Sequence, residues 1–205
     1  MAAIDFSTLD WAVASAALAG ETESGDKHCV IVRTNETLIG VVDGVGHGDE
    51  AACAAEIALS VLSGSSNGHL ISLMQLCHER LRGTRGVVMS LASIDRVQNL
   101  LTWLGVGNVQ GVLLRSLPSG SVTRENLLLR GGVVGAQLPS LQASVLPVGP
   151  NSTIVLATDG IHHQFADNLY GAESAQKLAD RIMSKYRRGN DDALVLVVRV
   201  SGSAL

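Results

Sequence analysis

A long succession of short apolar runs, each bounded by glycine or polar residues, is the feature that most limits how this chain can fold. After Arg85 such runs follow one another almost without interruption, and their lengths are typical of β-strands. We predict strands over residues 11–18, 29–33, 37–42, 87–94, 100–105, 110–115, 126–129, 140–146, 153–158 and 193–200.

Three other segments have a helical pattern. Residues 48–62 begin with Asp49 and Glu50, where carboxylates interact favourably with the helix dipole, and continue with alanines. Residues 69–81 place Leu70, Leu73, Met74, Cys77 and Leu81 on one face, and residues 172–186 form the third segment. Because the strands come in hairpin-like succession and the helices are grouped, we predict an α+β fold of antiparallel sheets with helices packed outside.

The composition is that of one globular domain over residues 1–205. Hydrophobic residues make up 46% and charged residues 17%, which is not the balance of a disordered chain. The net charge of −4 comes with no basic run, so we expect no nucleic-acid or membrane partner. The three cysteines form no CxxC pair and residues 1–10 contain no secretion signal, so we expect a cytoplasmic protein with reduced thiols.

Acidic residues stand where predicted strands begin or end. Carboxylates held on rigid strand ends suit Mg²⁺ and Mn²⁺, which take oxygen ligands and usually keep several waters. Two such ions close together could share a carboxylate, lower the pKa of a water and direct that water at phosphorus. The acidic residues in these positions are Asp26, Asp43, Asp159, Asp191 and Asp192.

Glycine follows two of these aspartates, in Asp43-Gly44 and Asp159-Gly160. Asp-Gly is also the commonest dipeptide of hairpin turns, so either one alone would more often be a turn than a metal site. The repetition of the arrangement favours the metal site without naming a reaction.

Five motifs, taken in order, resemble those of the metal-dependent protein phosphatase (PPM) family, in particular its bacterial sporulation and stress-response branch. They run nearly from end to end: Ser24-Gly25-Asp26, Val42-Asp43-Gly44-Val45-Gly46-His47-Gly48, Gly105-Val106-Gly107-Asn108, Ala157-Thr158-Asp159-Gly160 and Asn190-Asp191-Asp192-Ala193. The resemblance implies a four-layer α-β-β-α sandwich of two antiparallel sheets flanked by helices. It also implies hydrolysis of phosphoserine or phosphothreonine by direct attack of a metal-activated water.

A set of site residues follows from the same resemblance. Asp43 would bridge two Mn²⁺ or Mg²⁺ ions, and Gly44 would offer its carbonyl oxygen. His47 would act beside Asp43 as general acid or hydrogen-bond donor to the phosphate, the alternative being an ordinary exposed loop histidine. The other metal ligands would be Asp26, Asp159 and Asp191, with Asp192 as the alternative to Asp191.

The sequence departs from the family pattern at two points. Leu194 stands where the terminal motif usually has threonine, and residues 1–25 contain no Arg or Lys to match the phosphate-binding arginine of eukaryotic members. Phosphate would then be held by the metals alone, or by Lys27, Arg33 or His47.

In its small size and its lack of an appended sensor domain, the chain resembles stand-alone stressosome phosphatases. This implies a cytoplasmic monomer that acts on phosphorylated stressosome scaffold proteins of the STAS-domain type. One alternative is a weakly active or inactive module of the same fold that binds a phosphoprotein. Another is a hydrolase of small phosphate esters.

Overall fold

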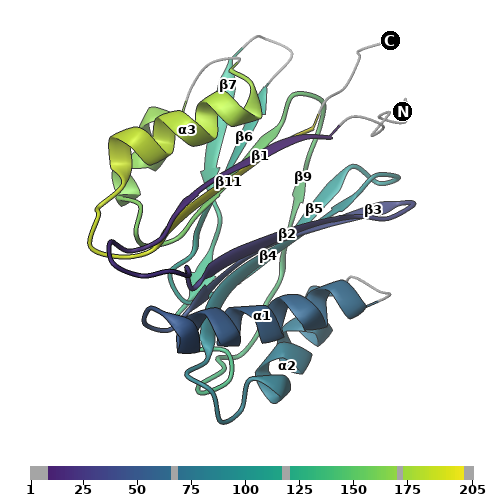
Figure 1. Cartoon of the computed structure of the whole chain (residues 1–205). Coiled ribbons are helices and arrows are strands. Elements are labelled where there is room, and N and C mark those ends of the chain that lie inside the picture. Colours follow the sequence, from purple (N-terminus) through teal and green to yellow (C-terminus); the bar gives the residue numbers. More distant parts are fainter. Residues whose placement is uncertain (1–8, 66–68, 117–120, 170–172, 201–205) are drawn as a thin grey trace.

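Two β-sheets lie face to face, and helices cover the outer face of each sheet (Figure 1). The computed structural model describes residues 9–65, 69–116, 121–169 and 173–200. Apart from the short pairing of β5 with β8, the strand ladders of these residues are antiparallel. The predicted fold class is therefore confirmed.

The first sheet has the strand order β1-β11-β10-β6-β7. Its strands are β1 (Leu9–Ala16), β6 (Gln110–Ser116), β7 (Val122–Asn126), β10 (Thr153–Ala157) and β11 (Ala193–Val200). The helix α3 (Ala175–Tyr186) and the short 3₁₀ helix η1 (His163–Asn168) cover its outer face. Strand β11 is apolar on both faces because one face meets α3 and the other meets the second sheet.

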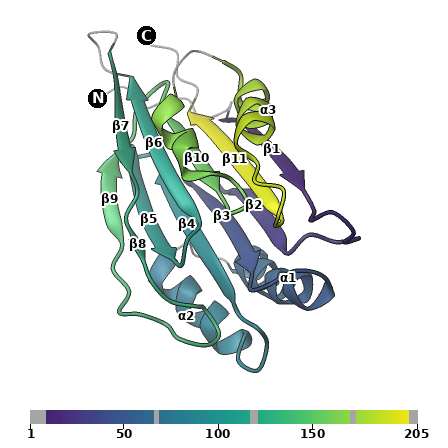
Figure 2. The same ribbon diagram turned by 90° about the vertical axis from the view of Figure 1, so that its left-hand side faces the viewer.

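The second sheet has the order β2-β3-β4-β5-β8, and β9 pairs with β5. Its strands are β2 (Asp26–Val32), β3 (Glu36–Gly44), β4 (Val87–Asp95), β5 (Leu100–Val106), β8 (Leu129–Arg130) and β9 (Ser144–Pro147). The helices α1 (Asp49–Gly64) and α2 (Leu70–Arg80) pack on its outer face (Figure 2).

The alternation of side chains along β3 decides which way its last residues face. Ile39 and Val41 belong to the core between the two sheets, whereas Leu38 and Val42 belong to the core under α1 and α2. Because side chains on a strand alternate between faces, Asp43 continues the series that points between the sheets. The strand thus presents a carboxylate at the end of an otherwise apolar interface.

The predicted elements are found with shifted boundaries, except in three places. Residues 126–129 are not one strand, because β7 ends in the first sheet and β8 begins in the second, and the chain crosses between the sheets there. Where a strand was predicted over residues 140–146, the paired strand is Ser144–Pro147. The 3₁₀ helix η1 was not predicted. The third helix begins at Ala175 after its N-cap Ser174, while the predicted start at residue 172 lies outside the described residues.

Candidate metal centre

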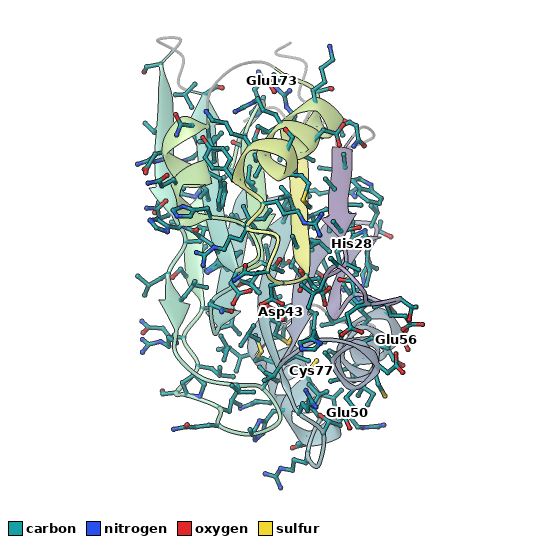
Figure 3. The ribbon with its side chains drawn as sticks, turned by 60° about the vertical axis from the view of Figure 1, so that its left-hand side comes forward. His28, Asp43, Glu50, Glu56, Cys77 and Glu173 are labelled. Carbon is teal, nitrogen blue, oxygen red and sulfur yellow. The ribbon has the colours of Figure 1, made fainter. Side chains whose placement is uncertain are left out.

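The pairing of β2 with β3 places Asp26 directly opposite Asp43. Directly opposite side chains lie on the same face of a sheet, with their Cβ atoms about 4.5–5.5 Å apart. One residue further along, the Gly44 amide donates to the Gly25 carbonyl at 3.1 Å. Figure 3 shows Asp43 between the part of the molecule that carries Glu173, next to α3, and the helix α1 that carries Glu50 and Glu56.

The surroundings of Asp26 and Asp43 disfavour the charged form of both carboxyl groups. Burial, reinforced by the charges of Asp26, Asp159, Asp191 and Asp192, raises the pKa of Asp43 to about 9. Burial also raises the pKa of Asp26 to about 7, although the Thr158 hydroxyl opposes this by donating to its Oδ2 at 2.7 Å. Among the ion pairs of the described residues, none involves either carboxylate. A divalent cation would relieve this repulsion, so the donor set fits one.

The first sheet contributes two further carboxylates at the same end of the sandwich. Asp159 follows β10 and Asp191 precedes β11, and these strands are antiparallel neighbours. Asn108 donates from Nδ2 to Asp159 Oδ2 at 2.8 Å. Burial and the nearby charge of Asp159 raise the pKa of Asp191. The structure therefore brings together all four aspartates that the resemblance implies as ligands.

These carboxylates form an open arrangement. Within the described ranges, no three His, Cys, Asp or Glu side chains stand close enough together to form a group that could hold a metal ion. Mg²⁺ is usually held by one or two carboxylates and several waters, so it does not require such a group. A Cβ placed on Gly25 would lie 3.5 Å from the Gly44 carbonyl oxygen, so the segment before β2 passes close to that oxygen.

Asp192 has a different position from its neighbour Asp191. Its Oδ1 accepts from the Leu18 amide at 2.7 Å and its Oδ2 accepts from the Gly25 amide at 2.7 Å, and the side chain is buried. Both oxygens are thus occupied in holding the segment before β2. Asp191 accepts only the Asp192 amide, at 2.9 Å, among the hydrogen bonds of the described residues. Of the two, Asp191 is the better candidate ligand.

Asp43-Gly44 is not a turn, whereas Asp159-Gly160 forms the centre of a turn in which the Ile161 amide donates to the Thr158 carbonyl at 3.1 Å. Gly44 is the last residue of β3, and a Cβ there would stand 2.1 Å from the carbonyl oxygen of Ala51 in the first turns of α1. A Cβ on Gly160 would stand 1.8 Å from the carbonyl oxygen of Asp192. In both cases glycine permits a second backbone segment to pack against the residue that follows the aspartate.

His47 lies on the loop between β3 and α1, where Nδ1 is 2.6 Å from Glu21 Oε1. The side chain is exposed, and its charged form would lower the pKa of Asp191, which places it beside the carboxylates. Because Glu21 engages Nδ1, the other ring nitrogen is left to face a ligand. No local sequence signal singles out Glu21, because it precedes His47 in a separate loop.

The two other residues predicted to hold phosphate lie elsewhere. Arg33 follows the opposite end of β2, where it donates to the Ser65 carbonyl at 2.5 Å and lies 3.6 Å from Glu36. Lys27 points toward α1, with Nζ 3.7 Å from Glu56. Neither cation therefore lies with the carboxylates.

The rings of the adjacent His162 and His163 stack, with their centroids 4.5 Å apart. His162 caps η1 by accepting from the Gln164 amide at 3.4 Å, and its own amide donates to the Tyr186 carbonyl at 2.7 Å. These contacts give His162 a structural role at the start of η1.

The departure at Leu194 is accommodated by the backbone. Its side chain packs in the core between the sheets, while its amide donates to the Thr158 hydroxyl at 2.9 Å. Since that hydroxyl in turn donates to Asp26, one short chain of hydrogen bonds connects the two sheets at this end.

Comparison with known proteins agrees with the fold and with the sequence resemblance. Residues 33–201 match the family model described as Stage II sporulation protein E (SpoIIE). The phosphoserine phosphatase RsbX of Bacillus subtilis (strain 168) is 20% identical over 183 residues, which cover 89% of this chain and 90% of RsbX.

Solved structures are similar over nearly the whole chain. One chain of the structure described as "The bacterial stressosome: a modular system that has been adapted to control secondary messenger signaling" superposes with a TM-score of 0.83 at 33% identity, covering 94% of this chain and 100% of that one. RsbX in complex with magnesium superposes with a TM-score of 0.82 at 20% identity, covering 94% and 96%. The similarity to PPM phosphatases of the sporulation and stress-response branch is thereby confirmed.

Proposed function

We propose that this chain, which belongs to the SpoIIE family of PPM-type phosphatase domains, is a metal-dependent protein phosphatase acting on phosphoserine or phosphothreonine. One observation carries the proposal: carboxylates from both sheets converge at one end of the sandwich, where buried Asp26 and half-buried Asp43 face each other and neither forms an ion pair with a described cationic side chain. Membership of the family makes phosphoester hydrolysis the class of activity.

Each carboxylate has a proposed role at the metals. Asp43 would lie between two ions, Gly44 would offer its carbonyl oxygen, and the remaining ligands would be Asp26, Asp159 and Asp191. Bound Mn²⁺ or Mg²⁺ would lower the pKa of a coordinated water and polarise the phosphoryl oxygens of the substrate. Thr158 orients Asp26 through its hydroxyl, and Asp192 holds the segment that leads into β2.

His47 is the proposed proton donor. Its Nδ1 is held by Glu21, so Nε2 can give a proton to the seryl or threonyl oxygen as that oxygen leaves phosphorus. Asp43 and His47 are thus the two residues with proposed catalytic roles.

The proposed substrates are phosphorylated stressosome scaffold proteins of the STAS-domain type. This rests on the similarity to RsbX and to the stressosome-related structure. We further propose a single domain that works in the cytoplasm as a monomer. None of the helices described is long and apolar enough to cross a membrane. An inactive binding module is not favoured, because every carboxylate that the resemblance implies lies at this end of the sandwich.

A phosphatase assay tests the proposal directly. The purified chain is incubated with a phosphorylated scaffold protein in Mn²⁺, in Mg²⁺ or in a chelator, and phosphate release is followed. We expect the release of phosphate to depend on metal. Asp43→Asn should lower its rate by more than the roughly 10–100-fold loss that is typical when a residue hydrogen-bonded to a metal ligand is replaced. Asp180→Asn, an exposed change on α3, is the matched control. Absence of turnover on phosphoproteins with saturating metal would contradict the proposal, and faster turnover of small phosphate esters would favour that alternative.

A further inference from the structure

The pairing of β3 with β4 continues past the ends of both strands and leads to Arg85. Asp43 pairs with Val88 and Gly44 pairs with Val87. The Val45 amide then donates to the Gly86 carbonyl at 3.1 Å. The next residues in this series are Gly46 and Arg85, so Arg85 flanks the loop that begins at Asp43 and contains His47.

The side chain of Arg85 lies over the backbone of Gly46. Its Nη1 is 2.6 Å from the position that a Cβ on Gly46 would occupy, and Gly46 has a φ of +97°. A residue with a side chain would be strained in that conformation and would collide with the guanidinium. Because residue 46 is glycine, the Arg85 guanidinium can lie against the loop that joins Asp43 to α1.

Glu50, in the first turn of α1, holds the guanidinium by one edge. Arg85 Nε lies 2.5 Å from Glu50 Oε2. No hydrogen bond from Nη1 or Nη2 is formed within the described part of the chain. Arg85 is about half exposed and lines a groove of about 550 Å³ together with Asp49, Glu50, Cys53, Ala54, Gly83 and Thr84. An arginine fixed at Nε with its two amino groups open to solvent can still bind an oxyanion through both of them.

We infer that Arg85 binds the phosphate of the substrate at this site. The inference rests on the proposed function and names the residue that recognises its substrate. A phosphate monoester carries a charge of about −1.5 to −2 at pH 7. Arg85 supplies a positive charge with the planar fork that matches phosphate oxygens, whereas Lys27 and Arg33 point elsewhere.

Inorganic phosphate is a suitable probe, because it isolates this contact from the rest of a phosphoprotein. Its binding to the Mn²⁺-loaded protein is measured by calorimetry and its inhibition constant is measured in the phosphatase assay. The variants are Arg85→Ala, Arg85→Lys and the control Arg82→Ala, which removes the same charge from an exposed position in the same turn. We expect Arg85→Ala to weaken phosphate binding roughly 10- to 100-fold. Arg85→Lys should keep part of the affinity, since lysine retains the charge but not the fork.

Two readouts separate phosphate binding from a structural role. Arg85→Ala should leave the Mn²⁺ affinity and the Tm unchanged, because the ion pair with Glu50 is largely exposed. Unchanged phosphate binding would overturn the inference. An equal loss of phosphate affinity in Arg82→Ala would also overturn it. The same holds if Arg85→Ala lowers the Mn²⁺ affinity and the Tm enough to explain the weaker phosphate binding. If the wild type lacked turnover, the proposed function would fail while the calorimetric titration would still decide the role of Arg85.

Discussion

At the scale of single residues, the carboxylates that suit the site for a metal also destabilise the metal-free protein. Burial and like charges raise the pKa of Asp43 from 3.8 to about 9 and that of Asp26 to about 7. The folded protein therefore binds more protons than the unfolded chain once the pH exceeds about 4. Under that condition the free energy of unfolding falls as the pH rises, and the fall continues until the folded-state pKa is passed.

The fall of the free energy of unfolding with rising pH can be measured. Without metal, the free energy of unfolding of the wild type should decline from pH 5 to pH 9, as measured by urea denaturation at several pH values. Asp43→Asn removes a carboxyl group that must take up a proton when the chain folds, so its profile should be flatter and at pH 8 it should exceed the wild type by about 1–3 kcal/mol. A wild-type profile that rises with pH, or a less stable Asp43→Asn at pH 8, would contradict the charge repulsion.

The adjacent Asp191 and Asp192 should respond in opposite ways to the same substitution. Asp192→Asn has only one acceptor oxygen for the Leu18 and Gly25 amides, so it should lose about 1–3 kcal/mol of stability. Asp191→Asn should leave the metal-free protein about as stable as the wild type and should lower the Mn²⁺ affinity. Denaturation without metal and Mn²⁺ titration of both variants measure this contrast. Equal effects in the two assays would show that the neighbours share one role.

At the scale of elements, the close approach of α1 to β3 is what presents Asp43. The helix can lie this near because its inner face is alanine and because Gly44 has no side chain. Gly44→Ala would place a Cβ 2.1 Å from the Ala51 carbonyl oxygen, so the helix or the strand end must move.

Gly44→Ala should therefore cost at least about 2 kcal/mol of stability and most of the metal-dependent activity. The control is Gly64→Ala at the other end of α1, where a Cβ meets nothing within 4 Å. Gly64→Ala should be neutral or slightly stabilising, since alanine favours helix. Denaturation and phosphate-release assays compare the two variants, and a Gly44→Ala protein that matched the control would show that the contact is not required.

The elements and the acidic residues were largely predictable, because both depend on local pattern. Apolar periodicity identifies the strands, and Asp43 and Asp159 stand out because each follows such a run. The crossing between sheets at residues 127–128 was not predictable, because Leu127 and Leu128 continue an apolar run although one is buried and the other exposed. The contacts of Glu21 and Arg85 also escaped, since each depends on a loop brought near by tertiary pairing.

At the scale of the whole molecule, the proposed metal centre lies at the junction of the two sheets. Asp26 and Asp43 come from one sheet, and Asp159 and Asp191 adjoin strands of the other. Across this junction, hydrogen bonds of the described residues run from Leu194 through Thr158 to Asp26 and from the Gly25 amide to Asp192. A cation bound by all four carboxylates would add attraction where the metal-free protein has repulsion.

Metal binding should therefore stabilise the fold as a whole. If Mn²⁺ binds only the folded protein, a concentration of about 100 times Kd adds about 2.7 kcal/mol to the free energy of unfolding. For a chain of this length that corresponds to a Tm increase of roughly 5–10 °C. Scanning calorimetry against Mn²⁺ concentration measures it, with hydrogen exchange to locate the protection. Protection should increase at the ends of β3 and β10 together, because they belong to different sheets joined by the same ions. Asp43→Asn should abolish the shift, and protection confined to one sheet would mean that the ions do not bridge them.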